Sequence, residues 1–246
     1  MNYKLVTAKE RIDLLEEADK ISMEVWPEFM MHDEIANKYF SKLYKVFPEY
    51  QFWLINENNI IGIGNSIPLK FSDDLKNLPE KGWDWALSKG FEDNEKDVKP
   101  NLLCGLVITI NPKYQGKGFS TKMIKSMVNV GKKYGLNSLL IPVRPTLKPN
   151  YPTLSMKKYI EKKRDDGLLF DPWLRVHQKF GGEIVKICHK AMKIKGTISD
   201  WEQWTGMDFE ESGDFIIPGA LDTVKIDFEK DEGLYIEPNV WIHHKL

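Results

Sequence analysis

A glycine-rich loop that follows an apolar run is the stretch of this chain best suited to binding phosphate. It reads Gln115-Gly116-Lys117-Gly118-Phe119-Ser120 and comes shortly after a run that ends at Ile110. The first turn of a helix presents unpaired backbone N–H groups and the positive end of the helix dipole, so a loop wrapped there can bind phosphate oxygens through its main chain. Glycine lets the backbone approach the ligand closely. The pattern predicts a pyrophosphate site, and an ordinary glycine-rich turn is the alternative.

Spacing separates three motifs that share this chemistry. The nucleoside-triphosphate P-loop needs Gly-x-x-x-x-Gly-Lys-Ser/Thr, and here the first glycine is missing at the required distance. The dinucleotide fingerprint Gly-x-Gly-x-x-Gly has Thr121 in place of its third glycine. The motif Gln/Arg-x-x-Gly-x-Gly/Ala is met by Gln115 and Gly118, with Ser120 as the last small residue. This loop resembles the acetyl-CoA loop of the GCN5-related N-acetyltransferase (GNAT) superfamily.

The predicted elements follow the order found in that superfamily. A strand over 3–6 precedes a helix opened by the capping box Thr7-Ala-Lys-Glu10, and a second helix is expected near 33–46. Apolar periodicity and turn residues predict the remaining elements: strands over 51–55, 60–69, about 102–110, 138–143, 185–194, 224–228 and 240–243, and helices after Ser120 and over 172–181. The resemblance implies an α/β (α+β) fold, in which a mixed central sheet is splayed between its fourth and fifth strands and flanked by helices.

The length of 246 residues and the hydrophobic content of 42% suit one large domain, although two small ones are possible. A single GNAT-like domain over 1–246 is expected, with insertions at about 71–100 and 144–171 and a C-terminal extension over about 197–246. The capping box Ser199-Asp-Trp-Glu202 is expected to open that extension. Additions of this kind usually shape an acceptor pocket.

Composition excludes several classes of partner. A formal net charge of −1 is unsuited to a nucleic-acid binder, which needs concentrated Lys and Arg. Cys104 and Cys188 lie in apolar strands and are expected to be reduced and buried, and no Cys and His spacing suits a metal such as zinc. The polar N-terminus is not a signal peptide, so a cytoplasmic protein without a membrane partner is expected. Homodimers are common in the superfamily, which makes a homodimer possible by analogy.

The resemblance also implies a reaction, in which an amine attacks the thioester of acetyl-CoA directly within a ternary complex. The main chain of Gln115, Gly116, Lys117, Gly118, Phe119 and Ser120 would hold the pyrophosphate of coenzyme A, and Lys117 would add a point charge. The backbone from Ile108 to Ile110 would polarise the thioester carbonyl.

In the family, a tyrosine often protonates the departing thiolate. His177, four residues before Gly181, takes that position here. An imidazolium can donate a proton near neutral pH, which makes His177 the candidate acid. The alternative is a hydrogen-bonded core histidine, because His177 lies on an apolar stripe between Trp173 and Phe180.

Three residues are candidates for the base that accepts the proton of the amine. Glu28 lies where the family's first two helices meet, Asp84 stands between two tryptophans of the first insertion, and His243 lies in the last strand. A plain surface or capping role for each of them, and a base that acts through water, are the alternatives.

Arg144 directly follows the fifth strand, at the mouth of the expected splay. A guanidinium there could hold a substrate carboxylate bidentately, or it could form a structural salt bridge. The proline-rich stretch from Arg144 through Tyr151 to Pro152 is expected to form a pocket wall. Several aromatic residues could line a pocket for an apolar acceptor or simply pack in the core: Trp26, Phe29, Trp83, Trp85 and Trp241.

The function predicted from these residues is acyl-CoA-dependent N-acyl transfer, with acetyl-CoA as donor and a small-molecule amine as acceptor. One alternative is a GNAT-fold module that binds coenzyme A without turnover. Another is a transferase of the same fold that uses a longer acyl donor or a hydroxyl acceptor.

Overall fold

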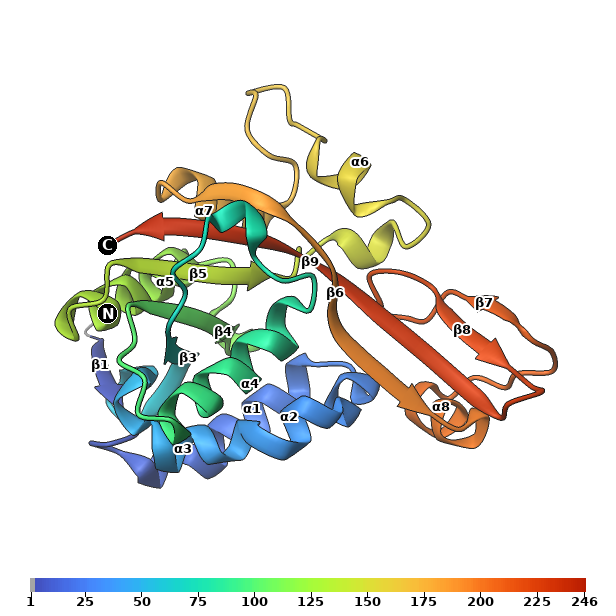
Figure 1. Cartoon of the computed structure of the whole chain (residues 1–246), viewed down its shortest axis with the longest axis horizontal. Coiled ribbons are helices and arrows are strands. Elements are labelled where there is room, and N and C mark those ends of the chain that lie inside the picture. The colour runs from blue at the N-terminus through green and yellow to red at the C-terminus, as the bar shows by residue number, and fades with distance from the viewer. Residues whose placement is uncertain (1–2) are drawn as a thin grey trace.

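A nine-stranded mixed sheet forms the centre of the molecule in a computed structural model, which describes residues 3–246 (Figure 1). The strand order is β1-β2-β3-β4-β5-β9-β8-β7, and β6 also pairs with β9. The strands are β1 Lys4–Thr7, β2 Gln51–Asn56, β3 Asn59–Leu69, β4 Leu102–Ile110, β5 Ser138–Val143, β6 Glu183–Gly196, β7 Gly213–Phe215, β8 Val224–Asp227 and β9 Glu232–Lys245. The parallel pair β4–β5 among antiparallel neighbours confirms the predicted mixed sheet.

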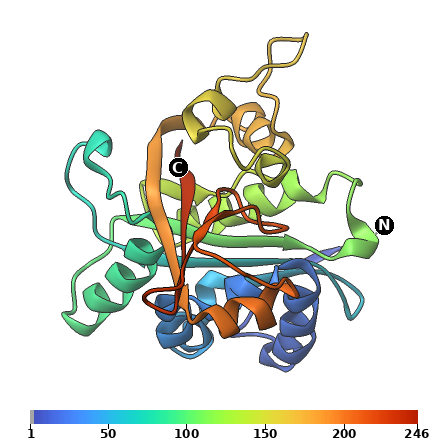
Figure 2. The same ribbon diagram turned by 90° about the vertical axis from the view of Figure 1, so that its right-hand side faces the viewer.

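Helices cover both faces of the sheet (Figure 2). They are α1 Leu15–Val25, α2 Glu34–Tyr39, α3 Leu43–Val46, α4 Gly82–Glu95, α5 Phe119–Lys133, α6 Met156–Ile160, α7 Pro172–Lys179 and α8 Ile198–Thr205. Because side chains alternate along a strand, Leu102, Cys104 and Leu106 of β4 join the core cluster that contains α4, whereas Leu103 joins the cluster that contains α5. Cys104 and Cys188 are both free and buried, as the sequence predicts.

The predicted splay between the fourth and fifth strands is present. The strands β4 and β5 pair only over Leu102–Cys104 and Ser138–Leu140, and beyond these residues they no longer pair. On its other edge β5 remains paired with β9 up to Val143, opposite Val240. One edge of β4 and one edge of β5 are therefore left without a strand partner over the same stretch.

The N-terminal helices differ in detail from the expectation. The backbone N–H of Thr7 donates to Glu10 Oε2 at 2.8 Å, as a capping box requires, but α1 begins only at Leu15 after a short 3-10 turn. The helix expected over 33–46 is divided into α2 and α3. Asp33 caps α2 by accepting the Ala36 N–H at 2.7 Å.

The segment predicted to be the first insertion is part of the main core. It contains α4, which packs on β3, β4 and β6 and buries Ala86, Leu87 and Phe91. Trp83 at its start donates its indole N–H to the Leu106 carbonyl at 3.0 Å, which ties α4 to the middle of β4. Within residues 3–246, no helix has the length and apolar character needed to span a membrane.

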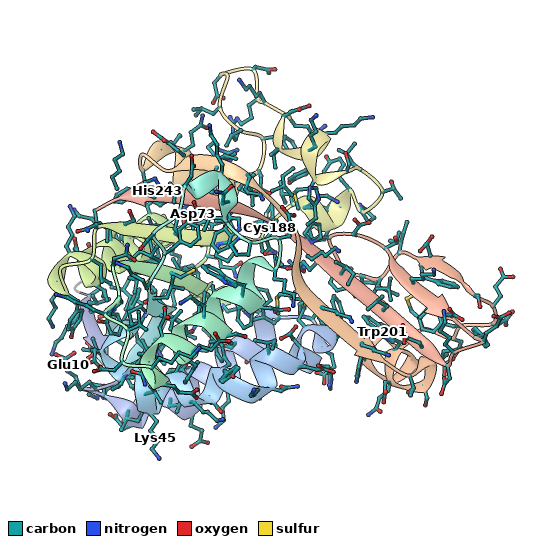
Figure 3. The ribbon with its side chains drawn as sticks, viewed as in Figure 1. Glu10, Lys45, Asp73, Cys188, Trp201 and His243 are labelled. Carbon is teal, nitrogen blue, oxygen red and sulfur yellow. The ribbon has the colours of Figure 1, made fainter. Side chains whose placement is uncertain are left out.

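The segment predicted to be a C-terminal extension forms an arm that carries α8, β7 and β8 on the long strands β6 and β9 (Figure 1). The capping box of α8 is formed by Thr197 and Asp200, so the prediction of Ser199 as the cap was wrong by two residues. Trp201 of α8 lies in this arm, far from His243 at the other end of β9 (Figure 3). Its ring packs on Phe29 with centroids 5.7 Å apart, which holds the arm against the N-terminal helices.

Candidate active site

The glycine-rich loop leaves the start of α5 open. Gly118 precedes the helix with a φ of 78°, Gly116 has a φ of 73°, and no side chain caps the helix. A Cβ added at either glycine would meet no atom within 4 Å, so the backbone faces open space on that side. The unpaired N–H groups of the first helical turn are consequently free to bind an anionic ligand such as a pyrophosphate.

Side chains before the loop hold it against the sheet. Asn111 donates from Nδ2 to the Ile60 carbonyl at 2.9 Å and accepts the Lys113 N–H at 3.1 Å. Gln115 donates to the Ile110 carbonyl at 3.2 Å. Lys117 is exposed, and its Nζ donates to the Lys113 carbonyl at 3.0 Å. The loop therefore has a defined shape before any ligand binds.

A cavity of about 680 Å³ extends from this loop along the splay. Five of the six predicted loop residues line it, Lys117 being the exception, and so do the predicted strand residues Ile108 and Ile110. The β3–β4 pairing slips by one residue near Leu106, which forms a bulge in the cavity wall, and bulges often redirect backbone groups at active sites. Backbone groups on the unpaired edge of β4 are thus available to a ligand in the splay.

The other end of the cavity is mainly apolar. Its wall contains aromatic rings, methionines and a proline: Trp26, Phe40, Trp83, Met30, Met31, Met192 and Pro27. Trp26 donates its indole N–H to Thr109 Oγ1 at 3.4 Å across the cavity wall. Of the predicted aromatic set, Trp26 and Trp83 line the cavity, whereas Phe29, Trp85 and Trp241 pack elsewhere.

A buried ion pair stands at this apolar end. Glu237 of β9 is fully buried, and its Oε2 accepts from Arg144 Nε at 2.9 Å and from the Tyr235 hydroxyl at 3.0 Å. Its Oε1 accepts from Asn239 Nδ2 at 3.0 Å. Arg144, Glu237 and Asn239 all line the cavity. Glu237 and Asn239 were not predicted as site residues, because the last strand was expected to begin at Val240, whereas β9 begins at Glu232. Their spacing from Tyr235 at every second residue was the available signal.

Arg144 also connects the cavity to the loop over 216–222. Its Nη2 donates to the Gly219 carbonyl, and its guanidinium lies 5.7 Å from the centre of the Trp26 ring. Gly219 has a φ of 88°, and a Cβ there would lie 2.7 Å from Pro27, so the loop packs closely against the cavity wall. Arg144 thus forms the structural salt bridge that was the alternative and still faces the cavity. Tyr151 does not line the cavity and packs on Tyr159 with ring centroids 5.7 Å apart.

His177 lies behind the cavity wall. It is fully buried, and its Nδ1 lies 2.9 Å from His244 Nε2. Trp173 lines the cavity, and the centre of its ring is 4.5 Å from that of His177. Burial lowers the pKa of His177 to about 3, so the imidazole is neutral at physiological pH. This placement matches the core-histidine alternative better than a role as the acid.

The three candidate bases also lie outside the cavity wall. Glu28 is exposed and pairs with His32 at 3.3 Å, and His243 is half-buried with its Nε2 3.1 Å from Ser138 Oγ. Asp84 is buried near Asp33, and burial raises its pKa to about 9. Among the described residues, Glu237 is the one carboxyl group that lines the cavity, and no imidazole does. No metal-binding group of three or more His, Cys, Asp or Glu side chains occurs over 3–246.

Comparison with known proteins gives one relative along almost the whole chain. Arginine N-acetyltransferase avaD of Aspergillus versicolor is 30% identical over 275 aligned residues, which cover 99% of this chain and 94% of the relative. No protein-family model matches the chain.

Two solved structures share the fold over the whole chain. The loading GNATL domain of CurA from Lyngbya majuscula has a TM-score of 0.65 and 20% identity, with 100% of this chain and 98% of that one covered. The GphF GNAT-like decarboxylase in complex with isobutyryl-CoA has a TM-score of 0.63 and 13% identity, with 100% and 99% covered. At these identities the likeness concerns the fold.

Proposed function

Because the chain belongs to the GCN5-related N-acetyltransferase superfamily and is an N-acyltransferase, we propose that it transfers acetyl from acetyl-CoA to a small amine. Arginine is the first acceptor to test, since the curated relative is named for it. The observation that carries the proposal is one continuous cavity of about 680 Å³, which joins the open start of α5 to the Arg144–Glu237 ion pair through the splay.

The donor half of this cavity suits coenzyme A. The first turn of α5 and the backbone around Gly116 and Gly118 would bind the pyrophosphate, since nothing occupies the space beside either glycine. Lys117 lies on the same loop, and its exposed ammonium group would add positive charge near the pyrophosphate. Bound there, an acyl-CoA supplies an activated thioester. Backbone N–H groups on the open edge of β4 would polarise its carbonyl.

The acceptor half would hold the amine against that carbonyl. In the reaction the amine nitrogen forms a bond to the carbonyl carbon, the C–S bond breaks, and the nitrogen loses a proton while the thiolate gains one. Neither His177 nor the three candidate bases lines the cavity, and Glu237, which does, is held in its ion pair with Arg144. We therefore propose that water carries these protons, and that the protein contributes mainly by positioning the reactants and polarising the carbonyl.

A longer acyl donor is the second candidate, and the apolar wall is the observation that favours it. Trp26, Trp83 and Met192 could pack against an acyl chain longer than acetyl. The two candidates are distinguished by assaying acyl-CoA donors of increasing acyl-chain length one at a time with arginine. The rate of free-thiol release is compared between donors. A maximum rate with acetyl-CoA is the expected result.

The first test is calorimetric titration with acetyl-CoA and with free CoA. Micromolar one-to-one binding is expected for the wild type, and Gly118→Asp should reduce it below detection. This change places a side chain and a negative charge where the pyrophosphate must bind, at a φ that disfavours a side chain. Gly167→Asp is the matched control, because Gly167 has a similar φ of 77° in a loop outside the cavity wall.

Two results would contradict the proposal. Normal binding by folded Gly118→Asp would exclude the loop as the coenzyme site. Normal acetyl-CoA binding by the wild type, without thiol release in the presence of arginine or other small amines, would favour a module that binds coenzyme A without turnover.

A further inference from the structure

The ion pair at the acceptor end keeps open hydrogen-bond positions on both partners. Arg144 uses Nε for Glu237 and Nη2 for the Gly219 carbonyl. Its Nη1 has no acceptor among the residues that the structure describes, although an arginine carries five N–H donors. Glu237 Oε1 accepts only from Asn239, and a carboxylate oxygen can accept two hydrogen bonds.

The surrounding residues hold both groups in place. The Tyr235 hydroxyl accepts the Leu221 N–H at 2.8 Å and donates to Glu237 Oε2 at 3.0 Å. Arg144 is further held by the Gly219 carbonyl and lies over the Trp26 ring. These contacts fix the carboxylate and the guanidinium before a substrate arrives, which lowers the entropic cost of binding.

A ligand that fits this pair must carry both charges. The ion pair has no net charge. A substrate with a single charge would add an uncompensated charge to this buried place, and it would leave the open position on Arg144 or on Glu237 without a partner. The head group of an amino acid carries a carboxylate and an amine on one carbon atom. It can therefore contact both members of a close ion pair at once.

We propose that Arg144 and Glu237 bind the head group of an α-amino acid. Arg144 Nη1 donates to the α-carboxylate, and Glu237 Oε1 accepts an N–H from the α-amine. Arg144 directly follows Val143 at the end of β5, so the α-amine lies next to the splay and is the nitrogen that receives the acyl group. This inference rests on the proposed function and names its acceptor class.

The first experiment compares arginine with agmatine, which is arginine without its carboxylate. Each amine is titrated by calorimetry into the full-length protein saturated with CoA, and each is assayed with acetyl-CoA. Arginine is expected to bind about tenfold more tightly or better, which corresponds to one charge-assisted hydrogen bond. Mass spectrometry of the product should show acetyl on the α-nitrogen.

Equal binding of the two amines, or a product acetylated on the guanidinium, would overturn the inference and leave the N-acetyltransferase function intact. The opposite combination separates the two claims. If arginine binds more tightly than agmatine but neither amine releases thiol, the head-group site stands and the proposed function fails.

Variants then test the two residues separately. Arg144→Gln should raise KM for arginine relative to KM for agmatine about 10- to 100-fold. Both amines lose the effect of Arg144 on Glu237, and arginine alone also loses the partner of its carboxylate. Glu237→Gln should raise KM for both amines, since arginine and agmatine both carry the amine nitrogen that Glu237 is proposed to bind. Arg164→Gln and Glu232→Gln are matched controls, because both residues form ion pairs outside the cavity.

Folding is checked by circular dichroism and by CoA affinity, which should match the wild type in each variant. Arg144→Lys keeps the positive charge beside Glu237 and replaces Arg144→Gln in these assays if the glutamine variant does not fold. Arg144→Lys should also lose the preference for arginine over agmatine, because lysine lacks Nη1. An unchanged arginine-to-agmatine ratio in a folded Arg144 variant would show that the pair is only structural.

Discussion

At the scale of single residues, burial decides which ionisable groups can take part in the chemistry. Glu237 is fully buried yet lines the cavity, and three donors compensate its charge. His177 is equally buried but faces His244 behind Trp173. Its lowered pKa follows from the removal of water around the imidazole, which disfavours the charged form. The two residues look alike in exposure and differ in what they face.

The variant His177→Phe tests this difference. We expect a lower melting temperature, because the change removes the Nδ1 contact with His244 and leaves a buried nitrogen unpaired, at a cost of about 1–3 kcal/mol. Turnover per folded molecule should remain close to that of the wild type. His189→Phe is the control at an exposed histidine. A loss of about 10²-fold in kcat in folded protein would instead support His177 as the acid.

At the scale of elements, a buried lysine joins two loops around the acceptor end of the cavity. Lys148 is 1% exposed, and its Nζ donates to the carbonyls of Tyr151 at 2.9 Å, Pro152 at 3.4 Å and Leu221. The loop that contains Leu221 also supplies Gly219 to Arg144. The loop after β5 and the loop before β8 are thus held together at one side of the cavity.

Replacing Lys148 with Met should loosen this connection. The change keeps much of the side-chain volume but leaves buried carbonyls without a donor, so the free energy of unfolding should fall by about 1–3 kcal/mol. KM for the amine should rise, whereas the affinity for CoA should be unchanged, because the glycine-rich loop proposed to bind CoA lies at the other end of the cavity. Urea unfolding and calorimetry measure the two effects. Lys157→Met, at an exposed position of α6, is the control. If KM rises equally in Lys157→Met, the effect of Lys148 on the acceptor end of the cavity is contradicted.

At the scale of the whole molecule, two buried carboxyl groups link elements that are distant in sequence. Asp33 caps the start of α2, Asp84 lies in α4, and both carboxyl groups lie close to the backbone of Lys193 in β6. Burial raises the pKa of both groups, and the charge of Asp33 helps to raise that of Asp84 to about 9. Each carboxyl also keeps one oxygen without a hydrogen-bond partner among the described residues.

This pair makes the stability of the fold depend on pH. The folded protein retains a proton on Asp84 that the unfolded chain has lost above about pH 4, so the free energy of unfolding should fall as the pH rises from about 4 toward 9. Asp84→Asn resembles the protonated form and does not titrate. At pH 8 it should be more stable than the wild type, and near pH 4 the two should be equal.

Urea unfolding at several pH values from 4 to 9 measures this dependence. Glu92→Gln, an exposed carboxyl on the same helix, is the control and should leave the slope unchanged. If Asp84→Asn and the wild type show the same slope, Asp84 is ionised in the folded protein and the proposed shift of its pKa is absent.

Local patterns in the sequence determined most of the elements. Alternating or continuous apolar runs placed β2, β3, β4 and β5 within a residue or two, because a strand between two helical layers needs apolar side chains on both faces. The glycines of the loop predicted an open helix start. Glycine readily adopts a positive φ and has no Cβ, so a ligand can approach the backbone closely, and both properties depend on the local sequence alone. Family, fold class and the position of the glycine-rich loop before a helix were all contained in such local signals.

The tertiary structure alone decided which side chains share the cavity. Glu237 meets Arg144 because β9 pairs with β5 along the edge away from β4, a pairing that joins residues 93 positions apart. The same packing places His177 behind Trp173 and leaves Glu28 exposed, although their types and neighbours in sequence suggested catalysis. Residue type and spacing determine what chemistry a side chain can perform. Long-range strand pairing and burial determine which groups it faces, and therefore whether it performs that chemistry.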